Sequence, residues 1–194
     1  MARLMAMQRA FCSALTFRLT SAGCVKRNSS RSACSLTVSF TSCAAIFLRA
    51  RMTAVPLAAC SGITIEESSL LQERNFGDLR GVPYVELTED PFGPDFVPPN
   101  GEDWPRFHAR VAEAFALILS RRRGVYGTLV VVTHGLVCRA LVERHALVPE
   151  GISVPATFDN TSVTGLHENA PHAVTLINCT RHLVTSLEIS GAPA

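Results

Sequence analysis

A single histidine, His134, stands where a strongly apolar run meets a helical pattern. Residues 129–132 are Leu, Val, Val and Val, a composition that suits a strand covered on both faces. Gly135 follows, and the apolar residues after it recur at helical spacing as far as residue 145. Ligands collect at the carboxyl ends of strands in open α/β sheets, and a helix N-terminus there favours an anion. A buried core histidine is the structural alternative, and this pattern alone does not decide between the two.

Five short motifs follow one another along the chain. They are residues 48–54 (LRARMTA), 72–81 (QERNFGDLRG), 101–103 (GED), 133–135 (THG) and 178–183 (NCTRHL). In order and spacing they resemble the signature elements of the histidine phosphatase superfamily, which includes phosphoglycerate mutases and fructose-2,6-bisphosphatases. The resemblance implies a metal-independent phosphomonoester hydrolase that forms a phosphohistidine intermediate. A mutase is less expected, because the mutases of this family are usually longer.

The resemblance also assigns roles to individual residues. His134 corresponds to the second histidine of the family, which hydrogen-bonds the phosphoryl oxygens, and Gly135 falls in the same substrate-binding motif. Glu73 corresponds to the general acid, Arg49 to a phosphate-binding arginine and Arg74 to a substrate contact. Such chemistry needs cations and N–H donors around the phosphoryl oxygens and an acid for the leaving alkoxide, but no metal or other cofactor. Each residue has a structural alternative: an exposed carboxylate, a surface helix charge or a structural arginine.

The nucleophile that the resemblance implies is missing. The family's R-H-G motif stands near the N-terminus, at the end of the first strand, whereas no histidine precedes His108. Residues 14–23 resemble the family's turn after that motif, and this register places the missing histidine at or just before Met1. One hypothesis is therefore a chain that starts downstream of R-H-G. The other is a catalytically inactive relative that binds a phosphorylated ligand, and the sequence upstream of the start codon would discriminate the two.

The elements around these motifs predict an α/β fold. The resemblance implies a three-layer sandwich with a mostly parallel central sheet, whose first strand is expected to be missing. We expect residues 48–190 to form the domain and residues 1–47 to be a divergent or truncated segment, in which residues 24–43 are assigned no structure. Strands are expected at residues 63–65, 129–134, 161–166, 174–178 and 183–189.

Two helices are expected besides the one after His134. Residues 50–60 predict a short helix, in which Pro56 is tolerable only in the first turn. Asp103 is expected to cap the N-terminus of the next helix, and Gly124 to end it. Residues 76–101 between these helices are rich in Pro and Gly and predict a long loop excursion.

Charge and cysteine usage restrict the partners. The first 51 residues contain eight basic and no acidic side chains, whereas residues 66–194 contain ten basic and all sixteen acidic ones. An acid-free, Arg- and Ser-bearing N-terminus is typical of a mitochondrial transit peptide, which is the alternative to a cytoplasmic location. The seven cysteines include no C-x-x-C pair and are odd in number, which favours a reducing compartment over a zinc site or a disulfide framework.

Three classes of partner remain to be weighed. The apolar runs are too short to span a membrane. The basic N-terminal segment has one lysine and no tight run with interleaved aromatics, so nucleic acid is not expected as a partner. We expect a small phosphorylated metabolite as the ligand, with a homodimer left open, and the sequence does not identify the phosphoester.

Overall fold

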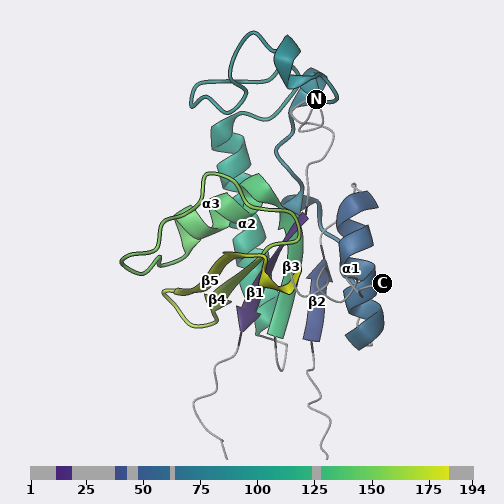
Figure 1. Cartoon of the computed structure of the whole chain (residues 1–194), viewed down its shortest axis with the longest axis vertical. Coiled ribbons are helices and arrows are strands. Elements are labelled where there is room, and N and C mark those ends of the chain that lie inside the picture. Colours follow the sequence, from purple (N-terminus) through teal and green to yellow (C-terminus); the bar gives the residue numbers. More distant parts are fainter. Residues whose placement is uncertain (1–11, 19–37, 43–47, 62–63, 124–127, 184–194) are drawn as a thin grey trace, which may run out of the picture.

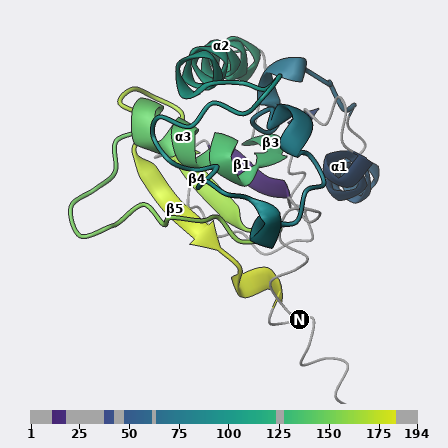
Figure 2. The same cartoon turned by 90° about the horizontal axis from the view of Figure 1, so that it is seen from above.

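The computed structural model describes residues 12–18, 38–42, 48–61, 64–123 and 128–183 of the 194-residue chain. These residues form a five-stranded sheet with helices on both of its faces (Figure 1). The strands are β1 (Cys12–Arg18), β2 (Val38–Ser42), β3 (Thr128–His134), β4 (Val163–His167) and β5 (Val174–Cys179). The α-helices are α1 (Leu48–Ser61), α2 (Trp104–Arg122) and α3 (Gly135–His145). The view in Figure 2 shows α2 and α3 on one side of the sheet and α1 on the other.

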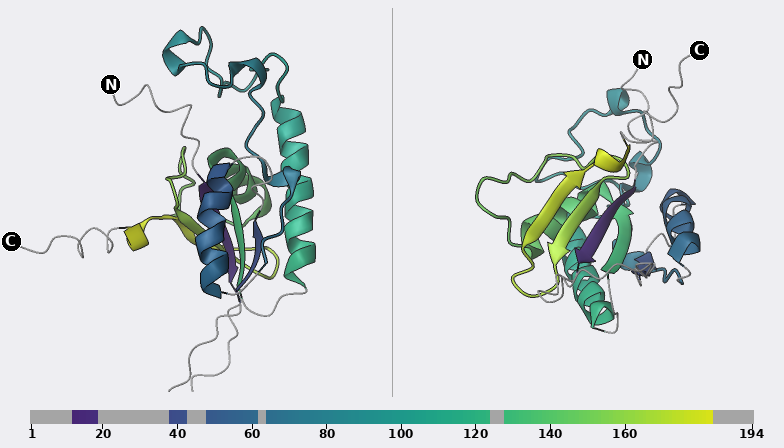
Figure 3. Two further views of the ribbon diagram at one scale, coloured as in Figure 1. Left: turned by 90° about the vertical axis from the view of Figure 1, so that its right-hand side faces the viewer. Right: turned by 60° about the horizontal axis from the view of Figure 1, so that its bottom comes forward.

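The sheet has the strand order β2-β3-β1-β4-β5, and Figure 3 shows β1 between β3 and β4. The strands β2 and β3 are parallel, as are β1 and β4, whereas β1 runs antiparallel to β3 and β5 antiparallel to β4. The α/β class is confirmed, but the sheet is mixed rather than mostly parallel. One reason is local, because the six residues between β4 and β5 are too few for a parallel crossover.

Two strands come from the segment that the sequence analysis set apart. Both β1 and β2 precede residue 48, and β2 lies within residues 24–43, to which we assigned no structure. The high Ser and Thr content of that stretch concealed a short alternation of Val38 and Phe40 with hydroxyl residues, a pattern that suits a strand. In the sheet, β1 lies between β3 and β4.

The helix α1 packs on the sheet through small side chains. Its buried residues Ala50, Ala54 and Ala58 recur every four residues, which places them on one face that can approach β2 and β3 closely. Pro56 lies inside this helix and not in its first turn, so the expectation for Pro56 was wrong. Pro56 is exposed, and the carbonyl that loses its N–H partner there is on the face turned toward solvent.

The helix α2 begins where the sequence predicts. Asp103 is its N-cap, and a side-chain oxygen of Asp103 accepts a hydrogen bond from the backbone N–H of Arg106 at 2.8 Å. Buried side chains of α2, α3, β3 and β4 form the core. The core includes Phe107, Val111, Ile118, Leu129, Val131, Leu141 and Leu166. In the strand expected at residues 63–65, Ile65 forms only an isolated bridge. In the strand expected at residues 183–189, residues 184–189 lie outside the described residues.

The excursion of residues 76–101 forms a lobe beyond the carboxyl end of β3 (Figure 1). It contains the short 3-10 turns η2 (Gly77–Leu79) and η3 (Tyr84–Glu86), and a third, η1 (Ser69–Leu71), precedes it. None of the helices in the described part of the chain could cross a membrane.

Candidate active site

The junction of β3 and α3 places His134 at the centre of the candidate site. His134 is fully buried and is the N-cap residue of α3, with extended backbone angles. Gly135 is the first residue of the helix, and a Cβ added there would lie 3.8 Å from the Phe158 carbonyl oxygen, an ordinary contact. A side chain would therefore fit at this position, so lack of space does not require the glycine. The N–H groups in this first turn and the positive end of the helix dipole favour an anion.

A buried hydrogen bond connects this junction to the segment that carries Glu73. The Thr133 hydroxyl donates to the carbonyl oxygen of Leu71 at 2.7 Å, and both side chains are fully buried. Because Thr133 precedes His134 and Leu71 precedes Glu73 by two residues, this bond fixes the two motifs relative to one another. The structure thus brings together two motifs that are about sixty residues apart in the sequence.

Replacing Thr133 by Val should destabilise the protein by about 1–3 kcal/mol, because the shape is kept while a buried hydrogen bond is lost. Chemical unfolding in urea would measure the change. The matched control is Thr175→Val on β5, where the side chain is exposed and the expected change is within about 0.5 kcal/mol. Equal stability of Thr133→Val and the wild type would contradict the structural role of this bond.

Glu73 follows Leu71 by two residues and lies next to this buried hydrogen bond in the sequence. Its side chain is half-buried, and its Oε1 accepts a hydrogen bond from the backbone N–H of Arg74 at 3.0 Å. This contact involves one carboxylate oxygen.

Arg74 has a structural environment. Its side chain is 2% exposed, and Nε, Nη1 and Nη2 donate to the carbonyl oxygens of Glu102, Pro91 and Phe96 at 2.9, 3.0 and 2.8 Å. The guanidinium carbon lies 3.8 Å from the centroid of the Trp104 ring. Arg74 thus ties the excursion to the domain, and this environment gives no support to a substrate contact.

Burial also affects the ionisation of the Arg74 guanidinium. Desolvation lowers the pKa of Arg74 from its usual value, while the nearby carboxylates of Glu102 and Asp103 raise it in part.

A second arginine holds the backbone on both sides of Leu71. Arg110 of α2 donates through Nη1 to the carbonyl oxygens of Leu70 and Gln72 at 2.7 and 2.9 Å. Its Nε and Nη2 donate to the carboxylate of Glu102 at 2.8 and 2.7 Å. This fork-to-fork pair is largely buried, with side-chain exposures of 19% and 13%. The pair fixes the segment that leads to Glu73.

Glu102 was predicted only as part of its motif, and neither Arg110 nor Thr133 was predicted as a site residue. One signal for Arg110 was present. It lies seven residues, or two helical turns, after the capping residue Asp103, so the two occupy the same side of α2.

The motifs that contain Arg74 and Glu102 meet backbone to backbone. The N–H of Glu102 donates to the carbonyl of Asn75 at 2.7 Å, and the N–H of Asp78 donates to the carbonyl of Pro99 at 3.0 Å. Gly77 has a φ of +54°, and a Cβ there would lie 1.9 Å from the Pro99 oxygen. Only glycine fits this crossing, which closes the base of the excursion.

Arg49 lies in the first turn of α1. β2 ends at Ser42, opposite Val132 of β3, and α1 begins six residues later. Arg49 therefore follows the carboxyl end of β2, the edge of the sheet that also carries His134. The Arg49 side chain lies outside the described part of the structure.

At this edge of the sheet, the strand register pairs Cys12, the first residue of β1, with His134. Among the residues that the structure describes, no group of three or more His, Cys, Asp or Glu side chains could hold a metal ion.

Comparisons with known proteins agree with the α/β fold. Residues 8–179 match the histidine phosphatase superfamily (branch 1). The structure of α-ribazole phosphatase from Shigella flexneri aligns with a TM-score of 0.56 and 21% identity, over 74% of this chain and 73% of that chain. A mycobacterial structure named hydrolase 2 aligns with a TM-score of 0.54 and 15% identity, over 94% of this chain and 99% of that chain. At these identities the likeness shows the fold alone. No curated protein matches the chain.

Proposed function

Because the chain belongs to the histidine phosphatase superfamily, we propose that it is a metal-independent phosphomonoester hydrolase. The phosphoryl group of the substrate binds at the junction of β3 and α3. The observation that carries this proposal is the placement of the buried His134 at the N-cap of α3, hydrogen-bonded through its neighbour Thr133 to the segment that bears Glu73. The substrate is a small phosphorylated metabolite.

In this mechanism, three kinds of group act on the substrate. The first-turn N–H groups of α3 and His134 donate to the phosphoryl oxygens, where transition-state charge is spread. Arg49 adds a positive charge at the same edge of the sheet. Glu73 protonates the leaving alkoxide. In the family to which the chain belongs, the phosphoryl group passes to a histidine near the N-terminus and then to water, and residues 1–107 of this sequence contain no histidine for that step.

A second candidate is a protein that binds phosphorylated ligands without turnover. It is favoured by one observation: residues 1–107 contain no histidine, although the family's nucleophile is a histidine near the N-terminus. The binding half of the site would be retained in this case, and the covalent step would be lost.

One experiment separates the two candidates. The purified chain is assayed with p-nitrophenyl phosphate in the presence of a chelator and is then examined for acid-labile phosphohistidine. Turnover together with phosphohistidine supports the hydrolase. Stoichiometric binding of vanadate without turnover supports the binding protein, and the absence of both activities would refute both candidates.

Vanadate binding tests the site itself. His134→Ala and Arg49→Ala should each weaken vanadate binding by about tenfold or more, because each removes a charge-assisted or buried hydrogen bond to the anion. Isothermal titration calorimetry would measure the affinity. The control is Arg51→Ala, two residues along α1, whose side chain is 63% exposed and lies 3.8 Å from Glu67. Unchanged affinity in both site variants would remove the phosphate site from this junction.

A further inference from the structure

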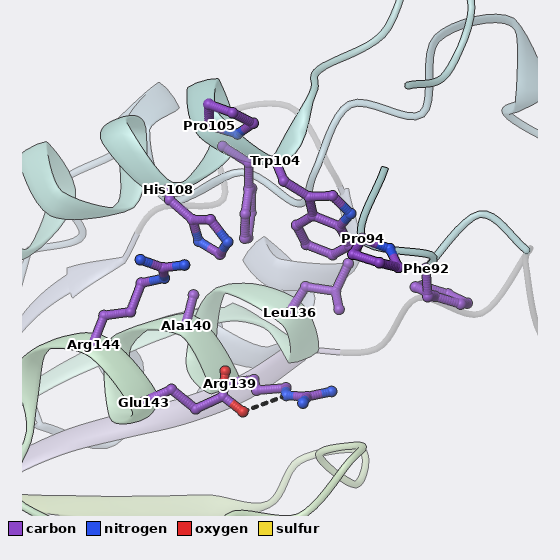
Figure 4. A pocket seen from close by; sticks show the side chains of 11 residues that line it. Phe92, Pro94, Trp104, Pro105, His108, Leu136, Arg139, Ala140, Glu143 and Arg144 are labelled. Atoms are coloured by element: carbon purple, nitrogen blue, oxygen red, sulfur yellow. Dashed lines mark hydrogen bonds and ion pairs between the residues drawn. The ribbon is translucent and has the colours of Figure 1, made fainter. Parts of the chain in front are cut away.

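An open groove of about 690 Å³ runs between α2, α3 and the excursion (Figure 4). One wall comes from the excursion and the first turns of α2, and the other from the outer face of α3. Neither His134 nor Glu73 lines it, so the groove is separate from the proposed phosphate site. It begins at Leu136, close to that site in the sequence, and extends along α3 to Arg144.

The α3 wall carries a positive charge that no neighbouring carboxylate neutralises. Arg139 already has polar partners, because its Nε donates to the Glu143 carboxylate at 2.7 Å and its Nη1 to the carbonyl oxygen of Ala156 at 3.2 Å. Arg144 is exposed and forms no ion pair within the described ranges. Figure 4 shows its guanidinium on the groove side of α3, facing His108.

His108 adds a polar group opposite Arg144. Its ring stacks on Trp104 at a centroid distance of 5.6 Å and an interplanar angle of 19°. Its Nδ1 is buried and has no hydrogen-bond partner among the described residues. Burial, and then the charge of Arg144, lower the pKa of His108, which favours a neutral ring that can still donate one N–H.

The opposite end of the groove is apolar. Phe92 and Pro94 of the excursion face Leu136 of α3, and Phe92 remains 47% exposed. Leu136, Ala140 and Arg144 are spaced four residues apart, so they form a stripe about 12 Å long on one face of α3. The groove therefore has an apolar end and a cationic end.

We propose that this groove binds an amphiphilic organic anion, whose charged group pairs with Arg144 and whose hydrocarbon part lies against Phe92, Pro94 and Leu136. A guanidinium without a carboxylate partner binds such an anion without first giving up an internal ion pair. The length of the stripe matches a medium-length hydrocarbon chain. The inference does not rest on the proposed hydrolase activity, since neither His134 nor Glu73 lines the groove.

Trp104 provides a direct measurement, because it is the chain's single tryptophan and lines the groove. Octanoate is titrated against the full chain while tryptophan fluorescence is recorded, and octanamide serves as the neutral probe of equal length. We expect octanoate to bind at least about tenfold more tightly than octanamide. Arg144→Ala should remove that difference by weakening octanoate alone.

Three controls complete the design. Arg123→Ala removes an exposed arginine that does not line the groove and should leave octanoate binding unchanged. Arg144→Lys keeps the charge and should retain most of the affinity. Saturating vanadate, which probes the His134 junction, should not displace octanoate.

The competing explanation is that Arg144 only stabilises the C-terminal turn of α3 through the helix dipole. Arg144→Ala would then alter the thermal midpoint and leave octanoate affinity unchanged. That result would overturn the proposal, as would equal binding of octanoate and octanamide or the absence of any Trp104 response.

Discussion

Replacing Arg74 by Met is expected to lower the free energy of unfolding by about 3 to 5 kcal/mol. The buried guanidinium donates to three backbone carbonyls, and each would lose its partner. The flat contact with Trp104 would also be lost. Because a domain of this size is stable by only about 5 to 15 kcal/mol, the excursion should loosen or the protein should unfold.

Urea unfolding followed by circular dichroism would measure this change. Arg74→Lys is the conservative variant, and it should be destabilising too, since an ammonium cannot reproduce the planar fork or the stacking. Arg106→Met is the matched control, because its side chain is 78% exposed and lies 3.7 Å from Asp103; we expect a change within about 0.5 kcal/mol. A stable Arg74→Met protein with impaired substrate binding would instead assign Arg74 to the substrate.

Replacing Glu73 by Gln is expected to slow the hydrolysis of an alkyl phosphate by about 10²- to 10⁴-fold, the usual contribution of a general acid. The loss should be much smaller for p-nitrophenyl phosphate, whose leaving group needs little protonation. Steady-state kinetics on the two substrates would show the difference.

The geometry makes this variant informative. The Glu73 Oε1 accepts the Arg74 N–H, and the amide oxygen of Gln can accept the same bond, so the fold should be retained. Urea unfolding provides that control. Equal losses on both substrates would mean that Glu73 positions the substrate and does not donate the proton.

The local parts of the candidate site could be predicted from the amino-acid sequence. The junction at His134, the helix after it and the cap at Asp103 follow from the types and spacing of neighbouring residues. These features depend on contacts within a few residues, such as the bond from the Arg106 N–H to Asp103. The five motifs also indicated the family, because their order along the chain is a property of the sequence.

The environment of Arg74 and the direction of β1 could not be predicted in this way, because both depend on contacts between distant parts of the chain. Arg74 reads as a substrate contact in its motif, but its hydrogen-bond partners are 17 to 28 residues away and become adjacent only when the excursion folds back. The direction of β1 against β3 likewise depends on pairing with residues more than a hundred positions distant. Local propensity contains no information on such pairings, because burial and backbone hydrogen bonding across the sheet select them.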